Sequence, residues 1–341
     1  MRKTLKTAWG NCFFYGGLFH VIRFFNNVFK RKRLTILAYH RVGDDHPDQN
    51  GSSLPFLIVS KAIFEEQLKF LKKWYKIIGF EDLYQNQDKD RMPKNALIIT
   101  FDDGYEDNYF NAYPILKKYD LKAVFFIPAN KMENQNNVPY WWDRAYYYLN
   151  RINIDVETED TPSNSNEVIS LFKIYSNNRS ALFQKLNGLN TEEIEKCLDD
   201  MGEKYGVDQT EIVVKNRRLR WEQIRTMGTE MEIGSHSCNH CNLVGIERAR
   251  KIYEIKQSAR IIENNCGKRV LAFSYPGGKR DEETEEMVED AGYKFAVTTR
   301  PGVNDLKNPL VLKRINIWEE TSLTEKGKFS KGYFSFKMMG F

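Results

Sequence analysis

The chain has 341 residues, 41% of them hydrophobic, and carries a formal net charge of +5 at neutral pH. This length and composition provide for one large catalytic domain with an insertion. The basic residues are spread out and no nucleic-acid-reading motif accompanies them, so a nucleic-acid partner is excluded. Five cysteines are an odd number in a long chain, which argues against a disulfide framework and favours a reducing compartment.

Residues 1–33 are the first predicted element, an amphipathic basic helix. Between Trp9 and Phe29 the apolar residues fall on one helical stripe, and basic residues flank the segment on both sides. The segment is too polar to span a bilayer, and no small-residue cleavage site follows it. Two interpretations stay open. The helix lies on the inner face of an anionic membrane, which makes the protein cytoplasmic and peripheral, or it packs on the catalytic domain.

Strands and helices alternate along the rest of the chain. Apolar runs predict strands at residues 34–39, 96–101, 123–127, 231–234, 270–274, 295–299 and 313–317, and amphipathic patterns predict helices at 61–75, 109–119, 246–264 and 282–291. Repeated strand–helix units imply an α/β fold with a parallel sheet. Residues 131–218 interrupt the alternation and predict a helical insertion or lid, and residues 321–341 form a C-terminal tail.

Two adjacent carboxylates, Asp102 and Asp103, follow the apolar strand at residues 96–101. Charge is costly beside a buried strand, and carboxylates persist there when a metal or a proton transfer requires them. Because neighbours at a strand end point to opposite sides, one carboxylate can bind metal while the other acts as a base. The alternative is a turn with a helix cap.

Two histidines, His236 and His240, follow the strand at residues 231–234, and their spacing predicts that both project from one face of a helical turn. With Asp103 they offer two imidazoles and one carboxylate, and three protein ligands leave a position open for water, as in a catalytic metal site. Cys238 and Cys241 form a CxxC interleaved with the histidines, so a structural zinc knuckle is the alternative. No second CxxC occurs in the chain, which favours Cys238 as a small apolar residue.

Four blocks in this order resemble the polysaccharide deacetylases, carbohydrate esterase family 4, also called the NodB homology domain. The blocks read LAYHRV from Leu37, TFDDG from Thr100, HSCNH from His236 and FSYPGG from Phe273. The resemblance covers residues 34–130 and 219–320. It implies a distorted (β/α) barrel of about seven parallel strands, similar to a TIM barrel, with the site at the carboxyl ends of the strands.

The activity implied by the resemblance is metal-dependent hydrolysis of N-acetyl groups, less often O-acetyl groups, on a surface polysaccharide or lipid-linked sugar. Asp103, His236 and His240 would bind a divalent metal, above all zinc, with cobalt, nickel or manganese as alternatives. Asp102 would be the general base, and the backbone N–H of Gly277 would stabilise the oxyanion. A catalytically silent, metal-containing glycan-binding module and an amidohydrolase for a non-sugar amide stay open as alternatives, and no pattern indicates the oligomeric state.

The chain departs from the family pattern at two positions. No histidine follows His240, so the usual general acid is missing from its usual place. His40, at the end of the first strand, is the candidate replacement, because the first and last strands of a closed barrel are neighbours; a core histidine is the alternative. Ser274 stands where the third block usually has an arginine, and Arg314 on the last strand is the candidate substitute.

Aromatic residues near the blocks and in the insertion are predicted to contact substrate. They are Tyr105, Tyr275, Trp141 and Trp142, together with Pro276. For the two tryptophans the alternative is that they anchor the insertion, because aromatic clusters are usually core.

Overall fold

The structure, a computed structural model, describes residues 3–21, 33–43, 53–85, 92–132, 138–152, 166–175 and 178–339. The chain divides into two compact units, and each is described by itself. Unit 1 comprises Met1–Asp44, Phe56–Glu133 and Arg218–Phe341, and unit 2 comprises Asp45–Pro55 and Asn134–Arg217. The domain limits given above stay predictions.

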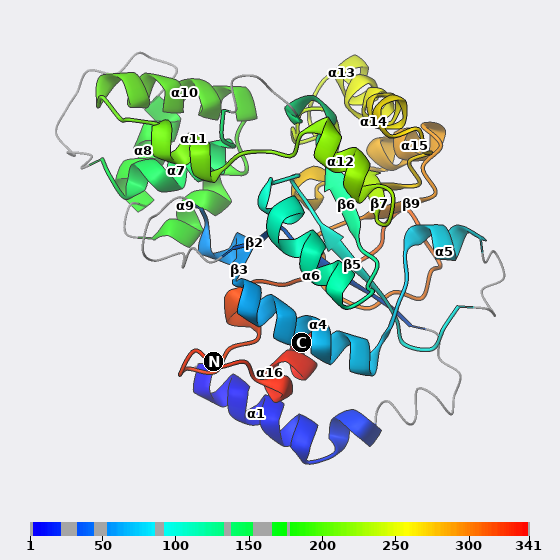
Figure 1. The fold of residues 1–341 in the computed structure, drawn as a ribbon. Helices are drawn as coiled ribbons and strands as arrows, with labels where there is room; N and C mark the ends of the chain where they lie inside the picture. The colour runs from blue at the N-terminus through cyan, green and yellow to red at the C-terminus, as the bar shows by residue number, and fades with distance from the viewer. Residues whose placement is uncertain are drawn as a thin grey trace. The chain divides into compact units, whose positions relative to one another are not determined.

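A parallel sheet forms the centre of unit 1 (Figure 1). Its strands are β1 (Leu34–Tyr39), β4 (Lys76–Ile77), β5 (Ala96–Phe101), β6 (Val124–Ile127), β7 (Glu232–Ser235), β8 (Ala272–Ser274), β9 (Phe295–Val297) and β10 (Ile315–Asn316). The order is β10-β1-β5-β6-β7-β8-β9, and β4 pairs with β5 outside this path. Every residue of β1, β5 and β6 is buried, as expected for strands covered on both faces. The predicted α/β fold with about seven parallel strands is confirmed.

The two ends of the sheet meet through the segment before β10. Leu312 forms a parallel bridge with Val297 of β9, and Arg314 donates its backbone N–H to the carbonyl of Arg300 at 3.0 Å. At the next residue β10 begins and pairs with β1, where Leu37 lies opposite Ile315. Residues 312–316 therefore connect β9 to β1 and bring the first and last strands side by side, as the barrel interpretation requires.

The helices of unit 1 cover the sheet. They are α1 (Lys3–Tyr15), α4 (Lys61–Trp74), α5 (Phe80–Gln85), α6 (Tyr113–Lys118), α12 (Trp221–Met227), α13 (Arg248–Ile252), α14 (Ser258–Cys266), α15 (Glu282–Asp290) and α16 (Lys331–Lys337). In α4 the side chain of Ser60 caps the first turn by accepting from the N–H of Ile63, and Phe64 and Leu68 are buried. Two predicted helices contain a π-helical turn, η3 (Asn108–Ala112) before α6 and η5 (Tyr253–Gln257) between α13 and α14.

Helix α1 packs against α16, and the two lie side by side in Figure 1. Gly10 faces Gly332 so closely that a Cβ on Gly10 would lie 2.8 Å from the Gly332 carbonyl oxygen. Phe13 and Phe14 are buried, Phe13 against Phe336 and Phe14 against Phe70 of α4. One face of the N-terminal helix therefore packs on the catalytic unit. Within the described ranges, no helix has the length and apolarity needed to cross a membrane. The part of the predicted stripe at residues 22–29 lies outside the described ranges.

Unit 2 is helical, with a core of its own. Its helices are α7 (Trp141–Leu149), α8 (Asn166–Tyr175), α9 (Arg179–Leu186), α10 (Thr191–Lys204) and α11 (Thr210–Lys215). Phe172, Leu182 and Leu198 are fully buried, and Arg144, also buried, pairs with Asp199 at 2.6 Å. The insertion therefore has enough apolar residues to form a core of its own.

Candidate active site

The site begins where β5 ends. The N–H of Asp102 donates to the carbonyl of Tyr39 at 3.0 Å and extends the ladder between β1 and β5 by one residue. Asp103 and Gly104 then adopt left-handed backbone conformations, with φ of 73° and 65°. Gly104 suits this geometry, since a Cβ there would lie 2.9 Å from the Met132 side chain. The prediction that the two carboxylates point to opposite sides is wrong, because Asp103 no longer follows strand alternation.

The histidine pair lies on a loop, so the predicted helical turn is wrong. β7 ends at Ser235, and both Ser237 and His240 have positive φ, 64° and 58°. Ser237 stabilises this bend because its Oγ accepts from the N–H of His240 at 3.0 Å, while its carbonyl accepts from the N–H of Ala129. The bend nonetheless brings both imidazoles to one place, with their ring centroids 4.6 Å apart.

Three donor atoms converge at this place. His236 Nε2 lies 3.5 Å from Asp103 Oδ1, and His240 Nε2 lies 3.3 Å from the same oxygen. Among the described residues these three are the group whose ligand atoms lie close enough together, within 4.8 Å of one another, to hold one metal ion. Two imidazoles and one carboxylate are the donor set of many catalytic zinc sites.

The hydrogen bonding of His236 shows why a cation fits. Its Nδ1 lies 2.7 Å from the carbonyl oxygen of Ser274, which can only accept, so Nδ1 carries the proton and donates. In the neutral ring Nε2 is then an acceptor that faces Asp103 and, at 3.9 Å, Asp102 Oδ2. Acceptors that face one another need a proton or a metal ion between them. A carbonyl that accepts from the other ring nitrogen and so orients the ring is typical of metal-bound histidines.

The charges and hydrogen bonds of this group also shift the pKa values of its members. Burial lowers the pKa of His236, but the charges of Asp102 and Asp103 outweigh it, and the pKa is raised. Burial raises the pKa of Asp103, yet its hydrogen bonds with His236 and His240 hold that pKa well below its ordinary value. The group therefore presents a buried anion between two imidazoles, an environment that attracts a cation.

Arg314 lies on the other side of Asp102. Its Nη1 donates to Asp102 Oδ1 at 2.7 Å and its Nη2 to Oδ2 at 2.6 Å, a bidentate pair in which both side chains are almost fully buried. Ser274 Oγ accepts from Arg314 Nη2 and donates to Asp102 Oδ2. Burial raises the pKa of Asp102, but Arg314 and then His236 lower it more, so the carboxylate stays ionised. Arg314, the candidate substitute for the arginine that the third block lacks, therefore lies against Asp102 in the structure.

His40 follows β1 at the same end of the sheet, half-buried, and its carbonyl accepts from the side chain of Asn108 at 2.8 Å. Tyr39 is paired with Phe101, so His40 and Asp102 stand side by side across two neighbouring strands. Burial lowers the pKa of His40 more than Asp103 and Asp102 raise it, so the resting ring is neutral at pH 7. The structure therefore places this histidine in the electrostatic field of the site, and its role as the acid stays a prediction.

The third block follows β8. Gly277 has φ of 62° inside the short turn η6 (Pro276–Gly278), and Gly278 leaves no room for a Cβ beside Thr299. Tyr275 is fully buried, and its hydroxyl donates to the carbonyl of Leu310 at 3.2 Å. Tyr105 is also fully buried, with the Arg41 guanidinium over its ring. The side chains of the two tyrosines therefore belong to the core, contrary to their predicted contact with substrate.

The tryptophans of the insertion are buried within unit 2. Trp142 stacks on Tyr140, with ring centroids 4.3 Å apart, and Trp141 stacks on Phe183 at 6.2 Å. Their packing explains why the sequence is aromatic here, since it builds the core of unit 2. Their contact with a sugar stays a prediction.

Sequence reasoning missed Glu254. This carboxylate lies in η5, is fully buried, and accepts three hydrogen bonds from the histidine loop. Its Oε2 accepts from the N–H groups of Cys238 and Asn239, at 3.0 and 2.8 Å, and its Oε1 accepts from the Asn239 amide at 2.7 Å. No motif marks a glutamate 14 residues beyond His240, and its neighbours one helical turn away, Arg250, Lys251, Gln257 and Ser258, are all polar, so the sequence carries no signal for it.

The zinc-knuckle alternative finds no support in the cysteines. Cys238 and Cys241 are both buried free thiols. Burial, with Glu254 nearby, raises the pKa of each thiol to about 12, and among the described residues the group whose ligand atoms converge is Asp103, His236 and His240, without either cysteine. Cys238 packs as a small apolar side chain.

Comparisons with known proteins agree with the fold and with the family resemblance of the sequence blocks. The family model described as polysaccharide deacetylase matches residues 89–168 and 178–296, more than half of the chain. YxkH of Bacillus subtilis, itself named as a polysaccharide deacetylase, is 24% identical over 80% of this chain and 67% of its own length. The poly-β-1,6-N-acetyl-D-glucosamine N-deacetylase of Staphylococcus aureus is 33% identical, over 32% of this chain and 40% of its own length.

A solved structure shows the same fold. The deacetylase PplD of Streptococcus pyogenes, solved in complex with acetate, superposes with a TM-score of 0.55 at 21% identity, covering 84% of this chain and 92% of its own. The family match, the barrel and the ordered sequence blocks point the same way. The chain belongs to the polysaccharide deacetylase family, the NodB-type carbohydrate esterases, and is a hydrolase of carbon–nitrogen bonds other than peptide bonds.

Proposed function

We propose that this chain is a metal-dependent N-deacetylase of an N-acetylhexosamine glycan, either a surface polysaccharide or a lipid-linked precursor of one. One observation carries the proposal. Three ligand atoms, from Asp103, His236 and His240, converge beside a fourth polar group, Asp102, that Arg314 keeps ionised. A metal-containing binding module needs the three ligands but has no use for a buried, ionised base next to them.

Each residue of the site has a proposed task. A bound divalent ion would supply Lewis acidity toward the acetyl carbonyl and toward a water molecule. Asp102 accepts the proton of the attacking water at Oδ1, which accepts one hydrogen bond, from Arg314, and keeps a lone pair; Oδ2 already accepts from both Arg314 and Ser274. The guanidinium limits how far the carboxylate can turn, so the base meets the water in a fixed orientation.

The remaining tasks are the oxyanion and the leaving amine. The backbone N–H of Gly277, in the turn η6 that follows β8, is the proposed donor to the oxyanion. His40 is the proposed general acid. Its neutral resting state means that it must take up a proton before it can deliver one to the departing nitrogen.

The named relatives support an N-acetylhexosamine glycan as the substrate class. The Staphylococcus aureus enzyme acts, by its name, on poly-β-1,6-N-acetyl-D-glucosamine, and it matches only a third of this chain. An acetamide on a hexosamine is therefore the proposed scissile group, with the linkage and chain length still to be measured.

Released acetate and new amine groups, measured together, test the proposal. Zinc-loaded protein is incubated with oligomers of β-1,6- and β-1,4-linked N-acetylglucosamine, with lipid-linked N-acetylhexosamine and with O-acetylated xylan. The matched control is metal-loaded Asp102→Asn, which should keep its metal but lose activity by a factor on the order of 100 to 10,000. Equal turnover in Asp102→Asn would reject the assigned base. Acetate released from xylan alone would reject N-deacetylation. If metal-loaded protein released acetate from none of the glycans, the catalytically silent glycan-binding module would be the better assignment.

We also propose that the enzyme works on the inner, reducing side of the membrane. All five cysteines are free thiols, and Cys12 is exposed while Cys197, Cys238 and Cys241 are buried. Cys12 therefore reports the location. A membrane-impermeant maleimide should label Cys12 in lysed but not in intact cells. A Cys12→Ser variant is the control, and labelling in intact cells would place the protein outside.

A further inference from the structure

The positive charge of the chain is concentrated in one segment. Residues 1–33 contain eight of the 51 lysines and arginines and none of the 46 acidic residues, so the remaining residues together carry a net charge of −3. The eight are Arg2, Lys3, Lys6, Arg23, Lys30, Arg31, Lys32 and Arg33. The whole positive excess of the protein therefore lies in this segment, although basic residues as such occur throughout the sequence.

Helix α1, within this segment, has two apolar faces. One face is buried, with Phe13 and Phe14 against the core and Gly10 against α16. The opposite face exposes large apolar side chains to solvent. Leu5 is 50% exposed, Trp9 62% and Tyr15 70%.

The helical turn at residues 18–21 continues the exposed face. Leu18 is 51% and Val21 47% exposed, while Phe19 between them is fully buried. From Thr7 to Ile22 the sequence has no charged residue. We call Leu5, Trp9, Tyr15, Leu18 and Val21 the outer stripe.

The outer stripe stands apart from the other exposed apolar side chains. It supplies five of the 13 large exposed hydrophobic residues found in the described part of the chain, within 17 residues, whereas the others are scattered from Phe56 to Tyr253. Scattered apolar residues need no explanation, but a group of exposed apolar residues within one short segment marks a contact surface.

We propose that the outer stripe is a membrane-docking surface for anionic lipid. Aromatic and aliphatic side chains enter the boundary between headgroups and acyl chains, while the flanking lysines and arginines meet the anionic headgroups. A second copy of the chain is the less favourable occupant, because two segments with eight positive charges each would be brought together. Since the inner face of α1 is packed on α16 and α4, docking would hold the catalytic unit at the lipid surface rather than tether it by a loose tail.

Vesicle flotation of the full-length protein tests this directly. The probe is phosphatidylcholine vesicles with and without phosphatidylglycerol. Trp9→Ser should weaken partitioning into the anionic vesicles about tenfold. Lys30→Ser with Lys32→Ser should weaken it about 20-fold and flatten its dependence on salt. The matched control is Phe110→Ser, which removes an aromatic ring of similar exposure, 58%, from η3 and should leave partitioning unchanged.

The outcomes are separable from those of the deacetylase assay, because metal-free protein serves for flotation. Thermal melting checks folding, and Trp9→Ser should melt with the wild type since its ring is largely exposed. Equal partitioning of Trp9→Ser and Phe110→Ser would overturn the proposal. So would a wild-type protein that ignores anionic vesicles. Concentration-dependent dimerisation that Trp9→Ser abolishes, without vesicle binding, would reassign the stripe to a second copy.

Discussion

Asp102 and Asp103 are adjacent in the sequence and are both buried, yet they have different partners. Asp103 lies between two imidazoles, whereas Asp102 lies against a guanidinium and a hydroxyl. Arg314 is fully buried, so its pairing with Asp102 also bears on stability. A buried charge is tolerated when it is paired, and losing one member leaves the other without compensation.

We expect Arg314→Met to destabilise the protein by about 3–5 kcal/mol, because it leaves the Asp102 carboxylate buried without its cation. The double variant Arg314→Met with Asp102→Asn removes both charges and should recover most of that loss. Denaturant unfolding of the wild type, both single variants and the double variant measures the coupling between the two residues. Additive losses would show that the ion pair does not hold this part of the site.

His40 offers a second test at the level of one side chain. If it protonates the departing nitrogen, His40→Ala should slow hydrolysis of acetamides far more than that of activated aryl acetates, whose leaving groups need little protonation. The ratio of the two rates on the same variant is the measurement. A similar loss on both substrates would make His40 a structural histidine.

At the level of elements, the π-helical turn η5 is connected to the histidine loop by hydrogen bonds to Glu254. Glu254 holds the loop through two backbone N–H groups and the Asn239 amide, and so acts on the metal ligands without touching them. We expect Glu254→Ala to weaken zinc affinity by about 10- to 100-fold, as for other groups that orient ligands, with the loss measured by competition with a chromophoric chelator.

The control for this variant is Glu263→Ala. Glu263 lies on the adjacent helix α14 and accepts from the N–H of Val270, remote from the loop. It should change stability without changing zinc affinity. If both variants bind zinc equally well, Glu254 supports the fold and not the metal ligands.

The sequence predicted the elements whose pattern is regular and missed those set by single backbone angles. β1 and β5 have the predicted bounds because their runs are mostly apolar and every residue in them is buried, and α4 differs by one residue. The helical turn at His236 and the opposed aspartates failed because Ser237, His240 and Asp103 adopt positive φ, which no periodicity signals. Arg314 could be predicted because the third block lacks its usual arginine and another arginine lies on the last strand. Nothing in the sequence connects Glu254 with the loop that carries His236 and His240.

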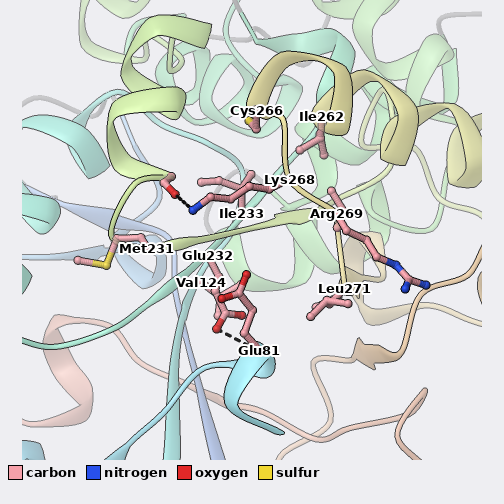
Figure 2. A pocket seen from close by; sticks show the side chains of 13 residues that line it. Glu81, Val124, Met231, Glu232, Ile233, Ile262, Cys266, Lys268, Arg269 and Leu271 are labelled. Atoms are coloured by element: carbon pink, nitrogen blue, oxygen red, sulfur yellow. Dashed lines mark hydrogen bonds between the residues drawn. The ribbon is translucent and has the colours of Figure 1, made fainter. Parts of the chain in front are cut away.

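At the scale of the whole molecule, a carboxylate at the far end of the barrel makes stability depend on pH. Glu232 begins β7, and its side chain accepts from the N–H groups of Phe80 and Glu81 at the start of α5. Glu232 lines a cavity of about 20 Å³ together with residues of the segments that lead into β7 and β8, and Figure 2 shows its side chain beside Glu81. Burial raises the pKa of Glu232 to about 7, more than the two backbone donors lower it.

The folded state therefore binds a proton at Glu232 between about pH 4.5 and 7 that the unfolded chain has released. The stability it confers is fully present below about pH 4.5 and is lost as the pH rises to 7, by about 3 kcal/mol. Glu232→Gln should remove this pH dependence and be more stable than the wild type at pH 8, as measured by denaturant unfolding. Glu230→Gln, an exposed neighbour, is the control, and parallel pH profiles for wild type and Glu232→Gln would contradict the assignment.

Metal binding should link the site to the stability of the whole barrel, because its ligands come from segments after β5 and after β7, more than 130 residues apart. A ligand that binds the folded state at 100 times its dissociation constant adds about 2.7 kcal/mol, which for a chain of this size raises the melting temperature by roughly 4 °C. Removing metal with a chelator should lower the melting temperature and abolish hydrolysis, and zinc, cobalt, nickel or manganese should restore activity to different extents. His236→Ala and Asp103→Ala should lose the zinc-induced shift, whereas Cys241→Ala should keep it. The reverse pattern would assign the ion to the cysteines and remove the basis for placing Asp102 beside a catalytic metal.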